Sequence, residues 1–251
     1  MYRQGTFVSY KKDMANVITQ IYGCEQIVDA QIAAALGADH IGCAYGEVPH
    51  LGDGQRNCAQ AKEFFEALPK NVVKVGLTIA TDVDEIIHDL SLYEPDVFHL
   101  SGDIRDISPE GVQRIRDAFP NLKIMQAIPV YAGVSADDQW DEVLSLVRAY
   151  EATSDFFLID TKDPKSTIGI GATGFVHDRE IDRRIIEFTK VKCIIAGGLD
   201  ASNVAQAIHE THPYGVDSCT LTSYPDFMKK ITGRVKDPTK VYEFIQAARN
   251  A

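Results

Sequence analysis

Apolar residues in this chain fall into two kinds of segment, short β-branched runs and longer amphipathic stretches. The short runs lack the strict polar–apolar alternation of a half-exposed sheet, so they are typical of parallel strands covered on both faces. They predict strands at Val17–Tyr22, His40–Ala44, Val72–Thr78, Val97–Leu100, Lys123–Ile128, Phe156–Ile159, Cys193–Ile195 and Gly215–Leu221.

A helix is predicted after each strand, because the longer stretches repeat apolar residues at helical spacing. Ser108 is a favourable N-cap with Pro109 in the first turn. The eight strand–helix units predict an α/β fold, a single-domain (β/α)8 TIM barrel over residues 17–251 with residues 1–16 as an N-terminal extension. An open doubly wound sheet is the alternative. The helices are expected at Glu25–Leu36, Cys58–Leu68, Val83–Tyr93, Ser108–Ala118, Asp137–Tyr150, Arg179–Lys190, Ala201–Thr211 and Pro238–Ala248.

The net charge of the chain limits the classes of molecule that it is expected to bind. Among 251 residues, 36 acidic and 25 basic side chains give a formal net charge of −11. That field repels polyanions, so no nucleic acid is expected, although backbone amides can still bind one phosphate group. The apolar runs are shorter than the roughly 18–20 residues of a membrane span, and the N-terminal residues lack the apolar core of a secretory signal.

The cysteines and histidines point to no disulfide framework and no metal. Five cysteines without CxxC spacing predict reduced thiols in a cytoplasmic protein. The seven histidines show neither HxH nor HxxxH spacing, so no metal site is predicted.

Candidate chemistry is expected at the carboxyl ends of the strands, where barrels of this kind carry their active sites. Asp160 directly follows the Phe156–Ile159 run; its position fits a general acid or base and equally a surface residue that caps a turn. Cys24 follows the first strand and is either a reactive thiol near the barrel mouth or an inert buried one. His99 and Cys43 lie inside predicted strands, where packed core residues are expected.

Two glycine clusters follow neighbouring strands. Gly169, Gly171 and Gly174 come after the sixth strand, and Gly197 and Gly198 after the seventh. One glycine pair would fit turn geometry alone. Because glycine lets backbone amides approach an anion and the late loops of such barrels bind phosphate, the two clusters together predict a phosphate site.

Several blocks in order resemble the phosphoribosylanthranilate isomerase family over roughly Val17–Ala248. The resemblance implies a barrel enzyme of tryptophan biosynthesis that performs an Amadori rearrangement of a phosphorylated aminosugar, without metal or organic cofactor. It implies a phosphorylated small-molecule substrate, no membrane partner, and a monomer or homodimer. The blocks are VDAQIAAALGADHIG, VKVGLTIATDVDEI, FHLSG, LIDTKDPKSTIGIGATG, IIAGGLDASNVAQAI and VKDPTKVYEFIQAAR.

The resemblance assigns catalytic roles to two positions. Asp160 matches the acid that protonates the sugar ring oxygen. The family's Cys base, in a Lys-Ile-Cys-Gly motif, falls on Gln20–Gly23, so Tyr22 stands in its place. A tyrosine, with a pKa near 10, is a poor base at pH 7, and Cys24 is the second candidate for that role.

The remaining departures concern substrate binding. Arg56 matches loosely the arginine for the substrate carboxylate, and Cys219–Leu221 replaces a Ser-Ser-Gly phosphate turn, where the Thr220 hydroxyl could substitute. Three functions stay open: an isomerase with an atypical base, an enzyme acting on a different phosphorylated metabolite, and a non-catalytic phospholigand-binding or regulatory relative. The substrate-binding positions that the resemblance implies are Arg56, His99, Gly171, Thr173, Gly174, Gly197, Gly198 and Thr220.

Overall fold

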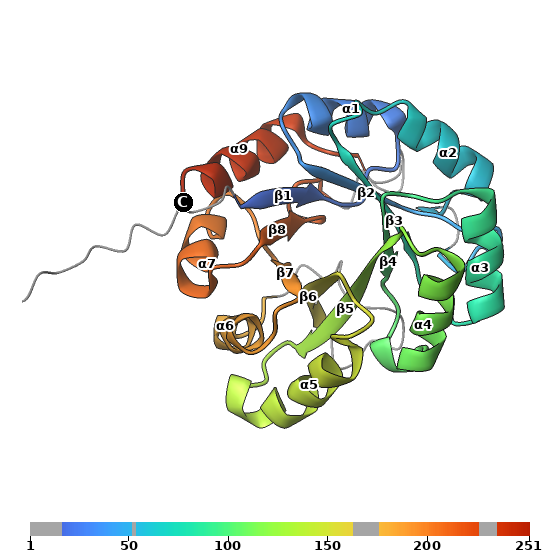
Figure 1. Cartoon of the computed structure of the whole chain (residues 1–251). Helices are drawn as coiled ribbons and strands as arrows, with labels where there is room; N and C mark the ends of the chain where they lie inside the picture. The colour runs from blue at the N-terminus through green and yellow to red at the C-terminus, as the bar shows by residue number, and fades with distance from the viewer. Residues whose placement is uncertain (1–16, 52–53, 163–175, 226–234) are drawn as a thin grey trace, which may run out of the picture.

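The computed structural model describes residues 17–51, 54–162, 176–225 and 235–251, so the expected extension at residues 1–16 lies outside the described part. Parallel strands form a closed barrel in chain order, and the last strand pairs with the first. Helices surround it (Figure 1). The closed order confirms the single (β/α)8 barrel and excludes the open doubly wound sheet.

The strands lie close to their predicted positions, with differences at their ends. Pairing between the fifth and sixth strands continues to Tyr131 and Lys162, past the predicted ends at Ile128 and Ile159. In these two strands the hydrogen-bonded pairing therefore extends beyond the apolar run from which each strand was predicted. The eighth strand is shorter than predicted and ends at Ser218 rather than at Leu221. The strands are β1 Ile18–Ile21, β2 His40–Ala44, β3 Val73–Thr78, β4 Val97–Leu100, β5 Lys123–Tyr131, β6 Phe156–Lys162, β7 Lys192–Ile195 and β8 Gly215–Ser218.

Most of the described helices begin with a side-chain cap; the helices that begin at Ile27 and Val204 show no such bond to a described residue. Ser108 Oγ accepts a hydrogen bond from the Gly111 amide at 3.3 Å, which confirms the predicted cap. Asn57 and Gln60 form a reciprocal capping box. The helices are α1 Ile27–Ala35, α2 Cys58–Glu66, α3 Val83–Leu92, α4 Pro109–Ala118, α5 Ala136–Tyr150, α6 Arg179–Phe188, α7 Val204–Thr211 and α9 Pro238–Arg249, with a short 3-10 helix η2 at Ile104–Asp106.

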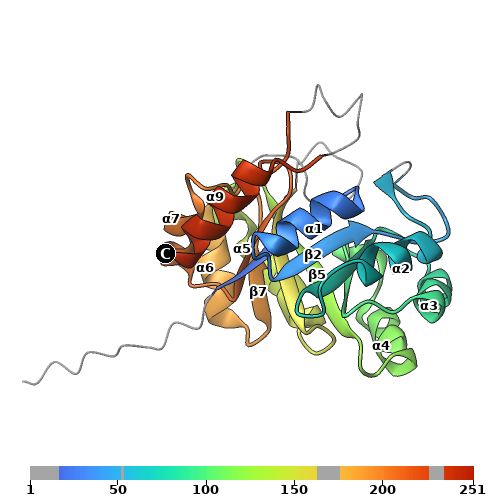
Figure 2. The same ribbon diagram turned by 90° about the horizontal axis from the view of Figure 1, so that it is seen from above.

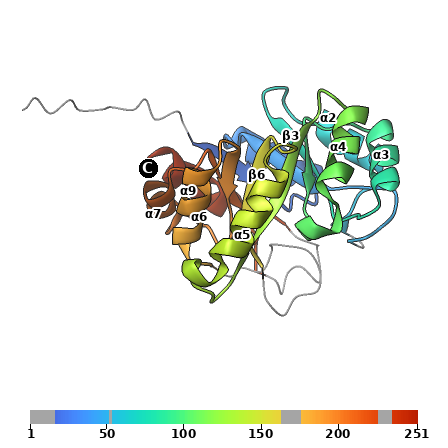
Figure 3. The ribbon, with the colours of Figure 1, turned by 60° about the horizontal axis from the view of Figure 1, so that its bottom comes forward.

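The last helix closes the outer ring. Helix α9 packs against both α7 and α1, so the two ends of the barrel sequence meet (Figure 2). On the other flank α5 and α6 pack side by side outside β6 (Figure 3). Within the described ranges, no helix is long and apolar enough to cross a membrane.

The apolar side chains of the strands form two layers. Outward residues such as Ile41 and Phe157 pack with helix residues such as Phe64 and Phe244. Inward residues fill the barrel; Val75, Val97, Met125, Leu158 and Ile194 belong to this second cluster. Burial on both faces explains why the strands read as continuous apolar runs.

Candidate active site

Polar side chains interrupt the apolar lining of the barrel interior. Asp160 lies within β6 rather than in the loop after it, which corrects the predicted boundary. Because strand side chains alternate, Asp160 shares the inward face with Phe156 and Leu158. The Thr161 amide donates to Asp160 Oδ1 at 2.7 Å. Burial raises the pKa of Asp160 to about 6, against the opposing effects of that hydrogen bond and of nearby positive charge.

A second carboxyl, Asp217 on β8, faces the same interior. Gln20 Nε2 donates to Asp217 Oδ1 at 3.2 Å, and Gln20 Oε1 lies 3.1 Å from His40 Nδ1. Burial first, and then the charge of Asp160, raise the pKa of Asp217 well above its ordinary value. The charge of Asp160 therefore disfavours ionisation of Asp217, and the two buried carboxyls are the candidate groups for acid–base chemistry inside the barrel.

Tyr22 fills the centre of the barrel beside His99. Its hydroxyl lies 2.7 Å from His99 Nδ1, and the two rings stack with centroids 5.6 Å apart. Burial lowers the pKa of His99 to about 3 and raises the pKa of Tyr22 well above 10. Both groups are therefore neutral at pH 7, and the Tyr22 hydroxyl has no tendency to act as a base.

Gly42 leaves the space that the Tyr22 ring occupies, since a Cβ at position 42 would lie 1.8 Å from ring atom Cε1. We expect Gly42→Ala to push the ring away from His99 and to lower the free energy of unfolding by about 1–3 kcal/mol. Urea denaturation measures this, with Gly54→Ala as control because its Cβ would meet, among the described residues, only Glu25 Oε1 at 3.8 Å. Equal stability of the two variants would contradict this packing.

Cys24 lies in a different layer from Tyr22. Its side chain belongs to the apolar cluster between barrel and helices, whereas Tyr22 belongs to the interior cluster. Residues two apart on a strand share a face, but Gly23 has φ +73° and turns the backbone between them. Burial also raises the pKa of Cys24 to about 12. Of the two alternatives for this residue, the burial of Cys24 favours the inert thiol over the reactive one, and the residue does not fit the role of base.

Arg56 also lies outside the barrel interior. Its guanidinium stacks over the Phe64 ring at 4.2 Å, donates to the Glu25 carbonyl and neighbours the Cys43 thiol on the outer face of β2. Among its contacts with described residues, none involves Asp160. The structure therefore does not bring the predicted carboxylate-binding arginine to the candidate acid.

The predicted phosphate positions after β7 lie in a turn with a left-handed backbone, a geometry that a glycine turn adopts with or without an anion. Gly197 and Gly198 have φ of +78° and +65°. Arg179 donates to the carbonyls of Ala196 and Gly197, so the amides of the same trans peptides, those of Gly197 and Gly198, point the other way. Neither amide donates to a residue in the described part of the chain. Gly171, Thr173 and Gly174 lie outside the described residues.

A buried lysine supports the turn after β8, which contains Thr220. Lys236 is 2% exposed, and its ammonium donates to the Cys219 carbonyl at 2.6 Å and to the hydroxyls of Thr222 and Ser223 at 3.2 and 3.1 Å. It places a positive charge beneath the turn where the family has Ser-Ser-Gly. No local pattern identifies this residue, because its partners are distant in sequence.

The sequence reasoning missed Asp217 as well, although the alternation of β8 contained a signal. Val216 packs in the outer layer, so its neighbour Asp217 faces inward. Among the described residues, no three His, Cys, Asp or Glu side chains come together as a metal site.

A closed barrel with paired acidic groups inside it and a glycine turn after β7 defines a class, the (β/α)8 enzymes that perform acid–base chemistry. The sequence profile of the N-(5'phosphoribosyl)anthranilate (PRA) isomerase family matches residues 20–220. The chain belongs to this family.

Individual relatives agree with that assignment. N-(5'-phosphoribosyl)anthranilate isomerase 2 of Methanosarcina mazei is 29% identical over 234 residues, which cover 92% of this chain and 93% of that protein. The N-(5'-phosphoribosyl)anthranilate isomerase of Geotalea daltonii is 31% identical, with coverages of 92% and 95%. The structure of the Pyrococcus furiosus isomerase has a TM-score of 0.73 at 21% identity, covering 94% of this chain and all of the other, and supports the fold.

Proposed function

We propose that this chain isomerises N-(5'-phosphoribosyl)anthranilate, a phosphorylated aminoaldose, to the corresponding aminoketose in tryptophan biosynthesis. Family membership over residues 20–220 carries the proposal. The inward position of Asp160, which matches the family's acid, supports it.

We assign the two proton transfers to the carboxyl pair. Asp160 donates its proton to the sugar ring oxygen while the nitrogen lone pair displaces that oxygen from C1, which opens the ring and forms a C1 iminium ion. Asp217 then removes the proton from C2, a double bond forms between C1 and C2, and the electron pair of the C–N double bond returns to nitrogen. The resulting neutral enol tautomerises to the ketone. Tyr22 is neutral and Cys24 lies in the outer layer, so neither fits the base role as well as Asp217.

The substrate phosphate is assigned to the turns after β7 and β8. The Gly197 and Gly198 amides point away from Arg179 and are suited to donate hydrogen bonds to an anion, and Lys236 supplies positive charge beneath the second turn. Thr220 and the glycine-rich stretch containing Gly171 complete the predicted set. The reaction needs neither a metal nor an organic cofactor, because both proton transfers are made by side chains.

We also propose that the enzyme is cytoplasmic, as expected for biosynthesis from soluble phosphorylated metabolites. We expect it to be a monomer or a homodimer. Both states occur among related structures, since monomers have been generated from the dimeric phosphoribosylanthranilate isomerase of Thermotoga maritima.

We expect the chain to restore growth without tryptophan in a strain that lacks this isomerase. Expression and solubility of the protein are checked in the same cells, and empty vector is the control. Absence of growth despite abundant soluble protein would contradict the proposal.

A second candidate is an isomerase of the same family that acts on a different phosphorylated metabolite. It is favoured by Arg56, whose guanidinium packs on Phe64 instead of facing the barrel interior, which suits a substrate without the anthranilate carboxylate. Turnover of another aminoaldose phosphate, without turnover of N-(5'-phosphoribosyl)anthranilate, would select this candidate.

A further inference from the structure

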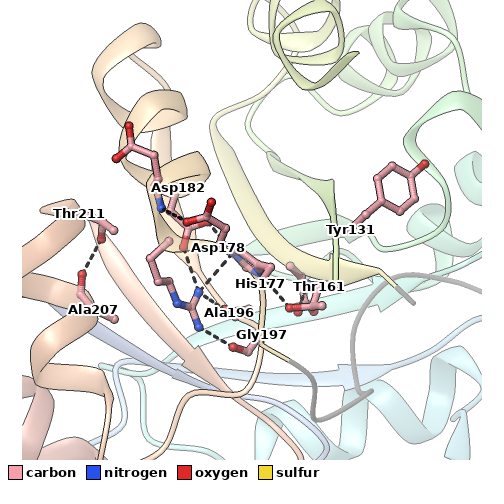
Figure 4. Close-up of polar contacts among 12 residues, drawn as sticks. Tyr131, Thr161, His177, Asp178, Asp182, Ala196, Gly197, Ala207 and Thr211 are labelled. Atoms are coloured by element: carbon pink, nitrogen blue, oxygen red, sulfur yellow. Dashed lines mark hydrogen bonds and ion pairs between the residues drawn. The ribbon is translucent and has the colours of Figure 1, made fainter. Parts of the chain in front are cut away.

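A buried chain of hydrogen bonds joins the end of β6 to helix α6 (Figure 4). Thr161 Oγ1 lies 2.7 Å from His177 Nδ1, and His177 Nε2 lies 2.8 Å from Asp182 Oδ1. Arg179 donates to Asp182 Oδ2 at 2.9 Å. The side chains of His177 and Asp182 are fully buried, so the network is closed to solvent at its centre.

The two ends of this network reach the two functional parts of the site. At one end Thr161 directly follows Asp160, and its amide holds the Asp160 carboxylate at 2.7 Å. At the other end Arg179 holds the carbonyls of Ala196 and Gly197, which sets the direction of the amides in the glycine turn.

Gly197 fits closely against the same network. A Cβ at this position would lie 2.1 Å from Thr161 Oγ1 and 2.9 Å from His177 Nδ1. The turn after β7 therefore contacts the network directly, in addition to its link through Arg179.

Stability alone is a poor explanation for such a network. Removing two charges from water costs several kcal/mol per ion, and well-packed apolar residues often replace a buried ion pair without loss of stability. What apolar residues would not supply is a fixed orientation of hydrogen-bonding groups at β6 and β7.

We propose that His177 is a positioning residue for the reaction: through Thr161 it orients the Asp160 carboxyl, and through Asp182 and Arg179 it orients the Gly197–Gly198 turn toward the phosphate. The inference rests on the proposed function for the roles of Asp160 and of the turn. It adds one rigid link between the acid and the phosphate site.

The electrostatics agree with this geometry. Burial raises the pKa of Asp160, the nearby His177 and Arg179 side chains lower it, and Asp182 raises it. From the barrel side the groups that face Asp160 are Asp217 and Tyr22. Removing the imidazole is therefore expected to raise the pKa of Asp160.

The test compares Thr161→Val and His177→Phe with the control Thr211→Val. Thr211 is also a buried threonine whose hydroxyl bonds at 2.7 Å, but its partner is the Ala207 carbonyl within α7 (Figure 4). We expect both network variants to lose about 10- to 100-fold in kcat/KM, with a raised KM, as misplaced reacting groups do. The control should stay within about twofold, and His177→Gln, which keeps a donor and an acceptor, should recover part of the loss.

Two further readouts do not depend on isomerase activity: the NMR titration of the Asp160 carboxyl and the affinity for inorganic phosphate. We expect the titration of Asp160 to move to higher pH in His177→Phe and phosphate affinity to fall in both network variants. If the wild-type protein lacks isomerase activity, the proposed function fails while these two measurements still decide the inference. Wild-type protein that does not bind phosphate, or network variants that lose only thermal stability as Thr211→Val does, would overturn it.

Discussion

Asp160→Asn is expected to lower kcat/KM by about 10³-fold, because the amide cannot protonate the sugar ring oxygen. The wild-type kcat/KM should fall as pH rises through about 6, because Asp160 loses there the proton that it donates. The variant should not show this fall near pH 6. A wild-type profile without the fall would contradict the acid role of Asp160.

The same substitution is expected to stabilise the fold at neutral pH. The pKa of Asp160 is raised in the folded protein from 3.8 to about 6, so its stability penalty is absent at low pH and grows as pH rises through that range. The rise of about two units in the pKa of Asp160 corresponds to a destabilisation of the folded protein by at most about 3 kcal/mol. The Asn variant does not ionise and so is free of this destabilisation. Urea denaturation at pH 4 and pH 8 measures the difference. A variant that is both active and less stable at pH 8 would contradict the assignment.

The barrel was predictable because its strands are buried on both faces, and continuous apolar runs follow directly from that burial. The ends of β5 and β6 could not be predicted in this way. The two strands remain paired through Pro129↔Asp160 to Tyr131↔Lys162, beyond the ends of their apolar runs. Hydrogen bonding between strands has no signature in hydrophobicity. That difference moved Asp160 from a loop into a strand and gave its side chain a fixed inward direction.

The site was only partly predictable for a related reason. The distance in sequence between Tyr22 and Cys24 suggested that one could replace the other, but the positive φ of Gly23 sends them into different layers. His177 meets Thr161 only through the fold, so no local motif announces that contact. Motif matching proposed Asp160 as the acid, and the three-dimensional arrangement was needed to identify the residues around it.

Asp217→Asn is expected to lower kcat/KM by about 10³-fold, whereas Tyr22→Phe should cost less than about tenfold, because only the first change removes a base. The Asn side chain retains an oxygen that can accept the hydrogen bond from Gln20, so the variant should keep the packing of β1 against β8. Tyr22→Phe removes the hydroxyl that bonds to His99, so its main effect should be a loss of stability of about 1–3 kcal/mol.

Exchange of the C2 hydrogen of the substrate with solvent deuterium separates the two variants by chemistry rather than by rate alone. Asp217→Asn should abolish this exchange while Asp160 can still open the ring, and Tyr22→Phe should retain it. The opposite pattern, with exchange lost in Tyr22→Phe and kept in Asp217→Asn, would contradict the role of Asp217. It would indicate that Tyr22, which stands at the position of the family's base, removes the C2 proton. A carboxylate inside the barrel can remove the C2 proton without the large pKa shift that a buried tyrosine would need, so the replacement of the family's cysteine by Tyr22 is compatible with an active isomerase.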